Sequence, residues 1–183
     1  AVRVLHLMVD HDVLRPVVPE IDKAGAARLE RLVHAEAAAG LAPQPIRRLA
    51  GLLPRDPAVN DAVGARLKLS KAERQTLASA IHDDRAENPH ALAYRIGPDR
   101  AADRLLLADD VEGARAVFGW TPPSLPITGG ALIARGLTKG PEVARTLRRI
   151  EDRWIAEDFP DAARTGAIAD ELVAQLLRSS SSA

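Results

Sequence analysis

The chain has 183 residues, which is enough for one domain, or for one domain and a small appendage. It contains no cysteine, and this excludes disulfide scaffolds, thiolate metal sites and cysteine nucleophiles. Its 25 basic and 25 acidic residues give a formal net charge of zero, which argues against a strongly basic nucleic-acid binder. Only 3% of the residues are aromatic, so we do not expect a platform that stacks single-stranded bases. Neither a membrane-spanning stretch nor a signal-peptide pattern is present, which predicts a cytoplasmic protein without a membrane partner.

Helical periodicity dominates the first 120 residues. The chain opens directly in a helical pattern of Val2, Leu5 and Val9, and no capping residue precedes it, so we expect a helix that has been cut into. Capping residues and apolar spacing predict further helices over 22–39, 45–53, from 57, over 70–81 and from 89. The segment 99–118 reads as one or two helices, with a break near Gly113.

The clearest interruption of the helical pattern lies at Trp120–Pro126, where three prolines within five residues predict an extended linker. Beyond it we expect helices over 128–134, 141–157 and 161–177, and then a disordered serine-rich end at 179–183. No segment alternates apolar and polar residues as a strand does. The prediction is therefore an all-α protein with a helical body over 1–120 and a helical tail over 121–183.

Basic residues gather around the start of the long helix expected in the tail. Gly140 followed by Pro141 leaves backbone N–H groups open at the helix start, and Lys139 lies beside them, which is an arrangement that can receive a phosphate. The helix is expected to bury Val143, Leu147, Ile150 and Trp154 on one face and to carry Arg145, Arg148, Arg149 and Arg153 on the other. A solvated face that is salt-bridged by Glu151 and Asp152 is the alternative reading of the same pattern.

A second basic cluster surrounds the capping box formed by Ser70 and Glu73. It consists of Arg66, Lys68, Lys71 and Arg74. These residues could contact an anionic partner, or they could simply form a polar turn between two helices.

Enzymatic signatures are weak. One carboxylate pair, Asp10 and Asp12, could in principle hold Mg²⁺, but no glycine is followed by serine and no phosphate-binding loop is present. There is also no Gly-x-Ser-x-Gly nucleophile turn. Two His-Asp pairs, His11-Asp12 and His82-Asp83, leave a compact HD-type metal phosphohydrolase open as an alternative. A helical protein-interaction module is a second alternative.

The segment from Leu125 to Phe159, LPITGGALIARGLTKGPEVARTLRRIEDRWIAEDF, resembles the C-terminal signature of bacterial tRNA nucleotidyltransferases, the CCA-adding and poly(A)-polymerase-like enzymes. The shared positions are Pro126, Thr128, Gly129, Leu132, Gly136, Gly140, Pro141, Val143 and Leu147. Segments 13–20, 46–50 and 67–74 are similar to the helical body of that family. Ala131 and Ala144 depart from the pattern, since the family usually has Asp and often Gly at these positions.

The resemblance implies that the parent enzyme adds C, C and A to the 3′ end of tRNA. It also implies that Mg²⁺, CTP and ATP bind a catalytic head whose Gly-Ser turn and carboxylate pair are not in this sequence. We therefore expect a non-catalytic body and tail that hold no metal or cofactor themselves. They would grip tRNA by its shape and phosphates, with the catalytic head as a second partner and without a DNA partner. The expected RNA contacts are Lys139, Gly140, Arg145, Arg148, Arg149 and Arg135, with Lys68, Lys71 and Arg74 secondary.

The neutral net charge hides an uneven distribution along the tail. Basic residues prevail over 127–149, and acidic residues prevail over 150–171. The basic region can therefore contact RNA locally although the chain is neutral. At long range, its attraction for RNA is largely cancelled by the repulsion from the acidic region. We accordingly expect weak RNA affinity for this chain by itself.

Overall fold

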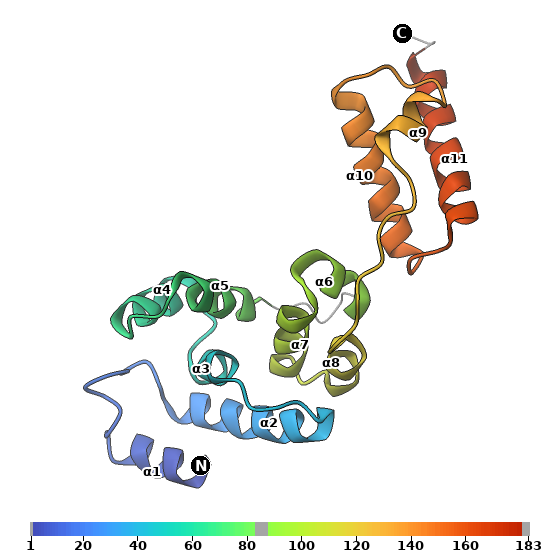
Figure 1. The fold of residues 1–183 in the computed structure, drawn as a ribbon. Coiled ribbons are helices and arrows are strands. Elements are labelled where there is room, and N and C mark those ends of the chain that lie inside the picture. Colours follow the sequence, from blue (N-terminus) through green and yellow to red (C-terminus); the bar gives the residue numbers. More distant parts are fainter. Residues whose placement is uncertain (1, 83–87, 181–183) are drawn as a thin grey trace. The chain divides into compact units, whose positions relative to one another are not determined.

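The computed structural model describes residues 2–82 and 88–180, and this part of the chain contains eleven helices and no strand (Figure 1). The predicted all-α class is thereby confirmed. The chain forms two compact units, Ala1–Pro122 and Pro123–Ala183, whose boundary falls inside the proline-rich segment expected to be a linker. None of the described helices is long and apolar enough to cross a membrane.

Unit 1 contains the first eight helices, and most of them begin at a residue whose side chain caps the helix. Asp22, Gln44, Asp56, Ser70 and Asn88 each accept a hydrogen bond from a backbone N–H of the following turn. The helices are α1 (Val2–Asp10), α2 (Lys23–Ala39), α3 (Pro45–Leu52), α4 (Pro57–Arg66), α5 (Lys71–Ala80), α6 (Pro89–Ile96), α7 (Pro98–Leu107) and α8 (Val111–Val117).

The break expected near Gly113 lies elsewhere. Segment 99–118 forms two helices, but the turn between them lies at 108–110, and Gly113 is inside α8. Asp110 caps α8 by accepting a hydrogen bond from the Gly113 N–H at 2.8 Å. A Cβ at position 113 would stand only 2.3 Å from Asp110 Oδ2. The glycine therefore makes room for a cap at the beginning of the helix and does not end it.

Two apolar cores hold unit 1 together, and a buried ion cluster lies beside them. The first core joins α2, α6, α7 and α8, and the second joins α3, α4 and α5. Arg47 of α3 is buried, and it donates to Glu36 Oε1 of α2 and to Asp103 Oδ1 of α7, both at 2.8 Å. This arginine thus links three helices with charged hydrogen bonds, the stronger kind in proteins.

Unit 2 consists of α9 (Gly129–Ile133), α10 (Pro141–Ala156) and α11 (Ala162–Ser180) around a core that includes Leu132, Ile150 and Ile168. The expectation of disorder from residue 179 is wrong for its first two residues, because α11 continues through Ser180. Ser179 donates its hydroxyl to the carbonyls of Gln175 and Leu176 at 3.1 and 2.9 Å, a local bond that a serine can make within a helix. Residues 181–183 lie outside the described part of the chain.

Candidate nucleic-acid interface

The long helix α10 has one buried side and one basic side. Ile150 and Trp154 are fully buried, and Val143 and Leu147 are half-buried against the same core, as the sequence predicts. Successive residues of an α-helix turn by about 100°. Arg145, Arg148 and Arg149 therefore project from the side opposite this core, and all three are exposed.

These three arginines stand out because they lack partners. Most arginines of the described chain donate to a carboxylate, a hydroxyl or a backbone carbonyl. Within residues 2–82 and 88–180, those with no hydrogen-bonded or ionic partner are Arg3, Arg100, Arg145, Arg148 and Arg149. Three of these five lie within five residues of α10 and on one of its sides. We call Arg145, Arg148 and Arg149 the α10 arginine face.

The charges of the α10 arginine face repel one another. Arg145 lies three and four residues before the other two, so the guanidinium groups are neighbours on the helix surface. Glu142 and Asp152 are the nearest acids along this side of α10, and neither forms an ion pair with the arginines. The face thus carries three positive charges that no ion pair offsets within the described residues, and a bound anion would neutralise them.

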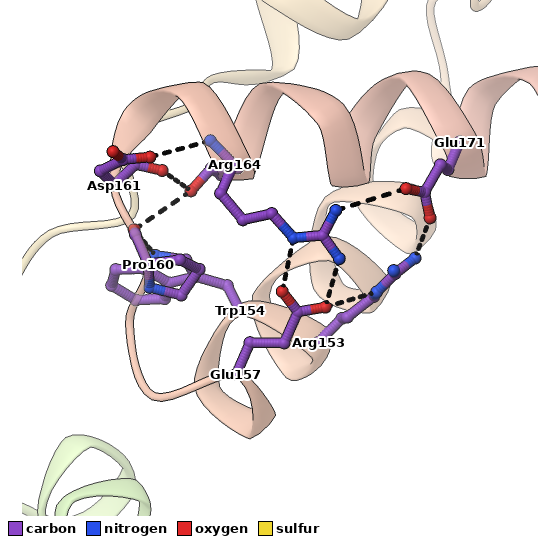
Figure 2. A network of polar contacts seen from close by, with 8 residues as sticks. Arg153, Trp154, Glu157, Pro160, Asp161, Arg164 and Glu171 are labelled. Atoms are coloured by element: carbon purple, nitrogen blue, oxygen red, sulfur yellow. Dashed lines mark hydrogen bonds and ion pairs between the residues drawn. The ribbon is translucent and has the colours of Figure 1, made fainter.

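Arg153 was expected on the same basic side, but it belongs to a network between α10 and α11. Figure 2 shows Arg153 and Arg164 meeting Glu157 and Glu171 at this junction. Arg153 Nε donates to Glu157 at 2.9 Å, and Arg164 Nε donates to the same carboxylate at 2.7 Å. The hydrogen bond from Arg164, supported by that from Arg153, lowers the pKa of Glu157 to about 2. Arg153 therefore links α10 to α11 and is not free to bind an anion.

The turn before α10 leaves the helix start open. Gly140 is the N-cap residue, with φ 145° and ψ −163°, a conformation that is essentially restricted to glycine. No side chain caps this helix, and Pro141 at its first position has no N–H to offer. Lys139 precedes the glycine, is exposed, and has no partner within the described residues. The positive end of the helix dipole and an exposed ammonium group thus adjoin the same turn.

Arg135 is placed differently from the α10 arginine face. Its guanidinium donates to Asp170 of α11 at 2.7 Å and to the Ala131 carbonyl at 3.0 Å. These bonds tie the end of α9 to α11 and offset the charge of Arg135. The α9 cap is supplied by Thr128, whose hydroxyl accepts from the Ala131 N–H at 3.4 Å.

The second basic cluster lies in unit 1, at the turn between α4 and α5, and the structure divides it. Arg74 is bound to Asp61, and Arg66 donates to both oxygens of Glu20 at 2.8 and 2.9 Å. Lys68 and Lys71 are exposed and have no partner within the described residues. Half of this cluster is therefore already used for internal ion pairs.

The residues of the HD-type alternative do not form a metal site in the described part of the chain. Nowhere in 2–82 and 88–180 do three His, Asp or Glu side chains gather closely enough to hold a metal ion. Asp12 faces Arg15 at 3.8 Å, and His82 follows α5. Asp83, the other half of the second pair, lies outside the described residues.

Unit 1 contains a cavity of about 450 Å³ that the sequence does not predict. Its lining includes Phe118 and Arg100, which is one of the five partnerless arginines named above. The residues around it come from segments between positions 41 and 118 of the chain. No local spacing could have indicated the cavity, because chain folding alone brings these segments together.

The comparisons with known proteins assign no family. Searches of the chain against protein-family models and against curated proteins return no match. The resemblance of 125–159 to tRNA nucleotidyltransferases therefore stays a prediction from the sequence.

Proposed function

We propose that this chain is a tRNA-binding body and tail of a CCA-adding tRNA nucleotidyltransferase, and that the α10 arginine face contacts the tRNA backbone. One observation carries the proposal: three of the five partnerless arginines of the described chain share one side of α10. Guanidinium groups bind phosphate oxygens with paired hydrogen bonds. Lys139 and the open start of α10 extend the same positive region toward the helix N-terminus.

The form of RNA that fits this surface is a double helix. Arg145 and Arg149 are one helical turn apart, which is about 6 Å along the helix axis and suits phosphates of one strand. Neither aromatic ring of unit 2 is free to stack on a base, because Trp154 is buried and Phe159 packs edge-on against it with ring centroids 4.9 Å apart. A surface with exposed cations and without free rings favours duplex RNA, which proteins read by shape and backbone contacts.

This proposal gives the chain a positioning role. The addition of nucleotides to the tRNA end, and the Mg²⁺, CTP and ATP that it requires, are assigned to the catalytic head that the family resemblance implies. The residues described here would orient the helical part of tRNA for that head.

The direct test replaces Arg145, Arg148 and Arg149 together by alanine. We expect the affinity for a tRNA transcript at low salt to fall on the order of tenfold or more, because three phosphate contacts are lost. Fluorescence anisotropy of labelled tRNA measures this affinity.

The matched control is the triple variant Arg3→Ala, Arg15→Ala and Arg31→Ala, which removes the same formal charge from exposed positions of unit 1. Arg15 and Arg31 have side chains that are 74% and 59% exposed and form only long ion pairs of 3.8 Å. If both triple variants lose the same affinity, general charge and not the α10 arginine face explains RNA binding, and the proposal fails.

A protein-interaction surface is a second candidate function, favoured by apolar side chains near the N-terminus. Val4, Leu7, Val13 and Val17 are each more than half exposed. Exposed apolar groups gathered in one region mark interaction surfaces. If the chain bound no tRNA even at low salt, and Leu7→Asp abolished a concentration-dependent self-association, this candidate would replace the first.

A further inference from the structure

The cavity of about 450 Å³ in unit 1 has the size of a small-molecule site. It is far from the α10 arginine face in the sequence, and all of its lining belongs to unit 1. Its apolar lining includes the side chains of Leu41 and Ala102, both buried, and of Phe118. Polar groups come from α3, α5 and the first turns of α7.

Phe118 is the unusual member of this lining. Its side chain is 54% exposed, although the chain has only five aromatic residues and the rings of most others are packed. Trp120 contacts His90 with ring centroids 4.8 Å apart, and Trp154 and Phe159 contact each other. An aromatic face beside a cavity is the group on which a flat ring can stack.

The charged groups of the cavity balance one another. Arg100 and Asp99 have no partner within the described residues, whereas Asp103 is bound by Arg47 at 2.8 Å. Burial raises the pKa of the Asp103 carboxyl, and its bonds to Arg47 oppose that rise. Two arginines and two carboxylates give no formal charge, so the cavity does not favour a polyphosphate. It offers an unused donor, Arg100, and an unused acceptor, Asp99.

We infer that this cavity binds an unpaired nucleobase. A nucleobase is a flat aromatic ring that can stack on Phe118. It is uncharged, as the sum of the charges in the lining is. It also carries acceptors for Arg100 and donors for Asp99. The base would stack on Phe118, accept hydrogen bonds from Arg100 and donate its exocyclic amino group to Asp99. The inference rests on the proposed function in one respect, since bound RNA would be a source of such a base. A free nucleotide is the other source.

The test is a titration of the whole chain with adenosine, cytidine and uridine 5′-monophosphates, followed by ¹H–¹⁵N NMR. We expect saturable shifts at Phe118 and Arg100 with the adenosine and cytidine nucleotides. Uridine monophosphate should bind more weakly because its base has no amino group for Asp99. Inorganic phosphate, as the control for ionic effects, should not shift these signals.

Two substitutions of Phe118 make the test specific. Phe118→Ala should weaken binding of adenosine monophosphate by at least about fivefold, since stacking on one aromatic ring is lost. Phe118→Tyr keeps the ring and should retain most of the affinity. Leu177→Ala removes a comparable exposed apolar side chain, 42% exposed, from unit 2 and should leave binding unchanged.

An unstructured tetranucleotide of adenosines distinguishes the two sources. Tighter binding than adenosine monophosphate supports a base supplied by RNA, and equal binding supports a free nucleotide. The inference is overturned if no mononucleotide causes saturable shifts at the cavity, or if Phe118→Ala binds as the unaltered chain does.

The α10 triple variant separates this inference from the proposed function. It should lose tRNA affinity and keep its affinity for adenosine monophosphate. Loss of nucleotide binding with intact tRNA binding in Phe118→Ala would leave the α10 proposal standing. If tRNA binding did not depend on the α10 arginine face, the proposed function would fail, but the cavity could still bind a free nucleotide.

Discussion

At the level of single residues, Arg47 holds the buried charges of unit 1. Its side chain is 4% exposed and pairs with Glu36 and Asp103, which are 2% and 10% exposed. Replacing Arg47 by Met would leave Asp103 buried without its cation and Glu36 with Arg48 as its only cation. We expect the free energy of unfolding to fall by about 3–5 kcal/mol, as measured by urea denaturation.

Arg48 provides the comparison for Arg47. It also binds Glu36, at 2.7 Å, but its side chain is 30% exposed. Arg48→Met should cost no more than about 1 kcal/mol because water replaces much of the lost interaction. Equal losses in the two variants would show that burial does not set the strength of this cluster.

Because of Glu157, we expect unit 2 to lose stability at acid pH. Arg164 and Arg153 lower its pKa in the folded state from 4.5 to about 2. A depressed carboxyl pKa stabilises the fold above the unfolded-state value, and this contribution is lost as the pH falls from about 4.5 to about 2. Thermal unfolding should therefore show a smaller difference in Tm between neutral and acid pH in Glu157→Gln than in the unaltered chain. An identical pH dependence in both would contradict the role given to this network.

Single residues also show which parts of the structure the sequence can predict. The caps at Asp22, Ser70 and Asn88 were predictable because each contacts backbone groups within three residues. The partners of Arg135 and Arg153 were not, since Asp170 and Glu171 are 35 and 18 residues away. Whether an arginine is free or already paired decides its role, and this depends on tertiary contacts.

At the level of elements, the proposed function depends mainly on α10. Its three arginines repel one another at spacings of three and four residues, and alanine favours helix more than arginine does. The triple alanine variant should therefore keep or raise the Tm of the chain, as followed by circular dichroism. A clear loss of stability would indicate that the arginines serve the fold and would weaken the case for RNA contact.

The helix α8 shows how an element boundary escapes a sequence rule. Gly113 looks like a breaker, but the boundary is set by Asp110, whose carboxylate caps the Gly113 N–H. Asp110→Ala should lower the free energy of unfolding by about 1 kcal/mol, the usual loss for an N-cap aspartate, in urea denaturation. Asp110→Asn keeps a side-chain oxygen that can accept from the Gly113 N–H and is the control. An equal effect of the two substitutions would contradict the cap.

At the level of the whole molecule, the chain has no net charge and forms two units with separate cores. The apolar periodicity predicted the helices and the buried side of α10, because both depend on local spacing. It could not show the cavity at Phe118, nor that Arg153 and Arg164 neutralise acids of unit 2 while the α10 arginine face remains unneutralised. The neutral total is therefore compatible with one local cationic surface.

The salt dependence of tRNA binding tests the central claim most directly. Each phosphate contact adds about 0.7–0.9 to the slope of log affinity against log salt concentration. Binding should be measured over about 50–200 mM salt for the unaltered chain and for the variant with Arg145, Arg148 and Arg149 replaced by alanine. The account predicts a slope that is shallower by about 2–3 in the variant. Equal slopes, with equal affinities, would contradict it.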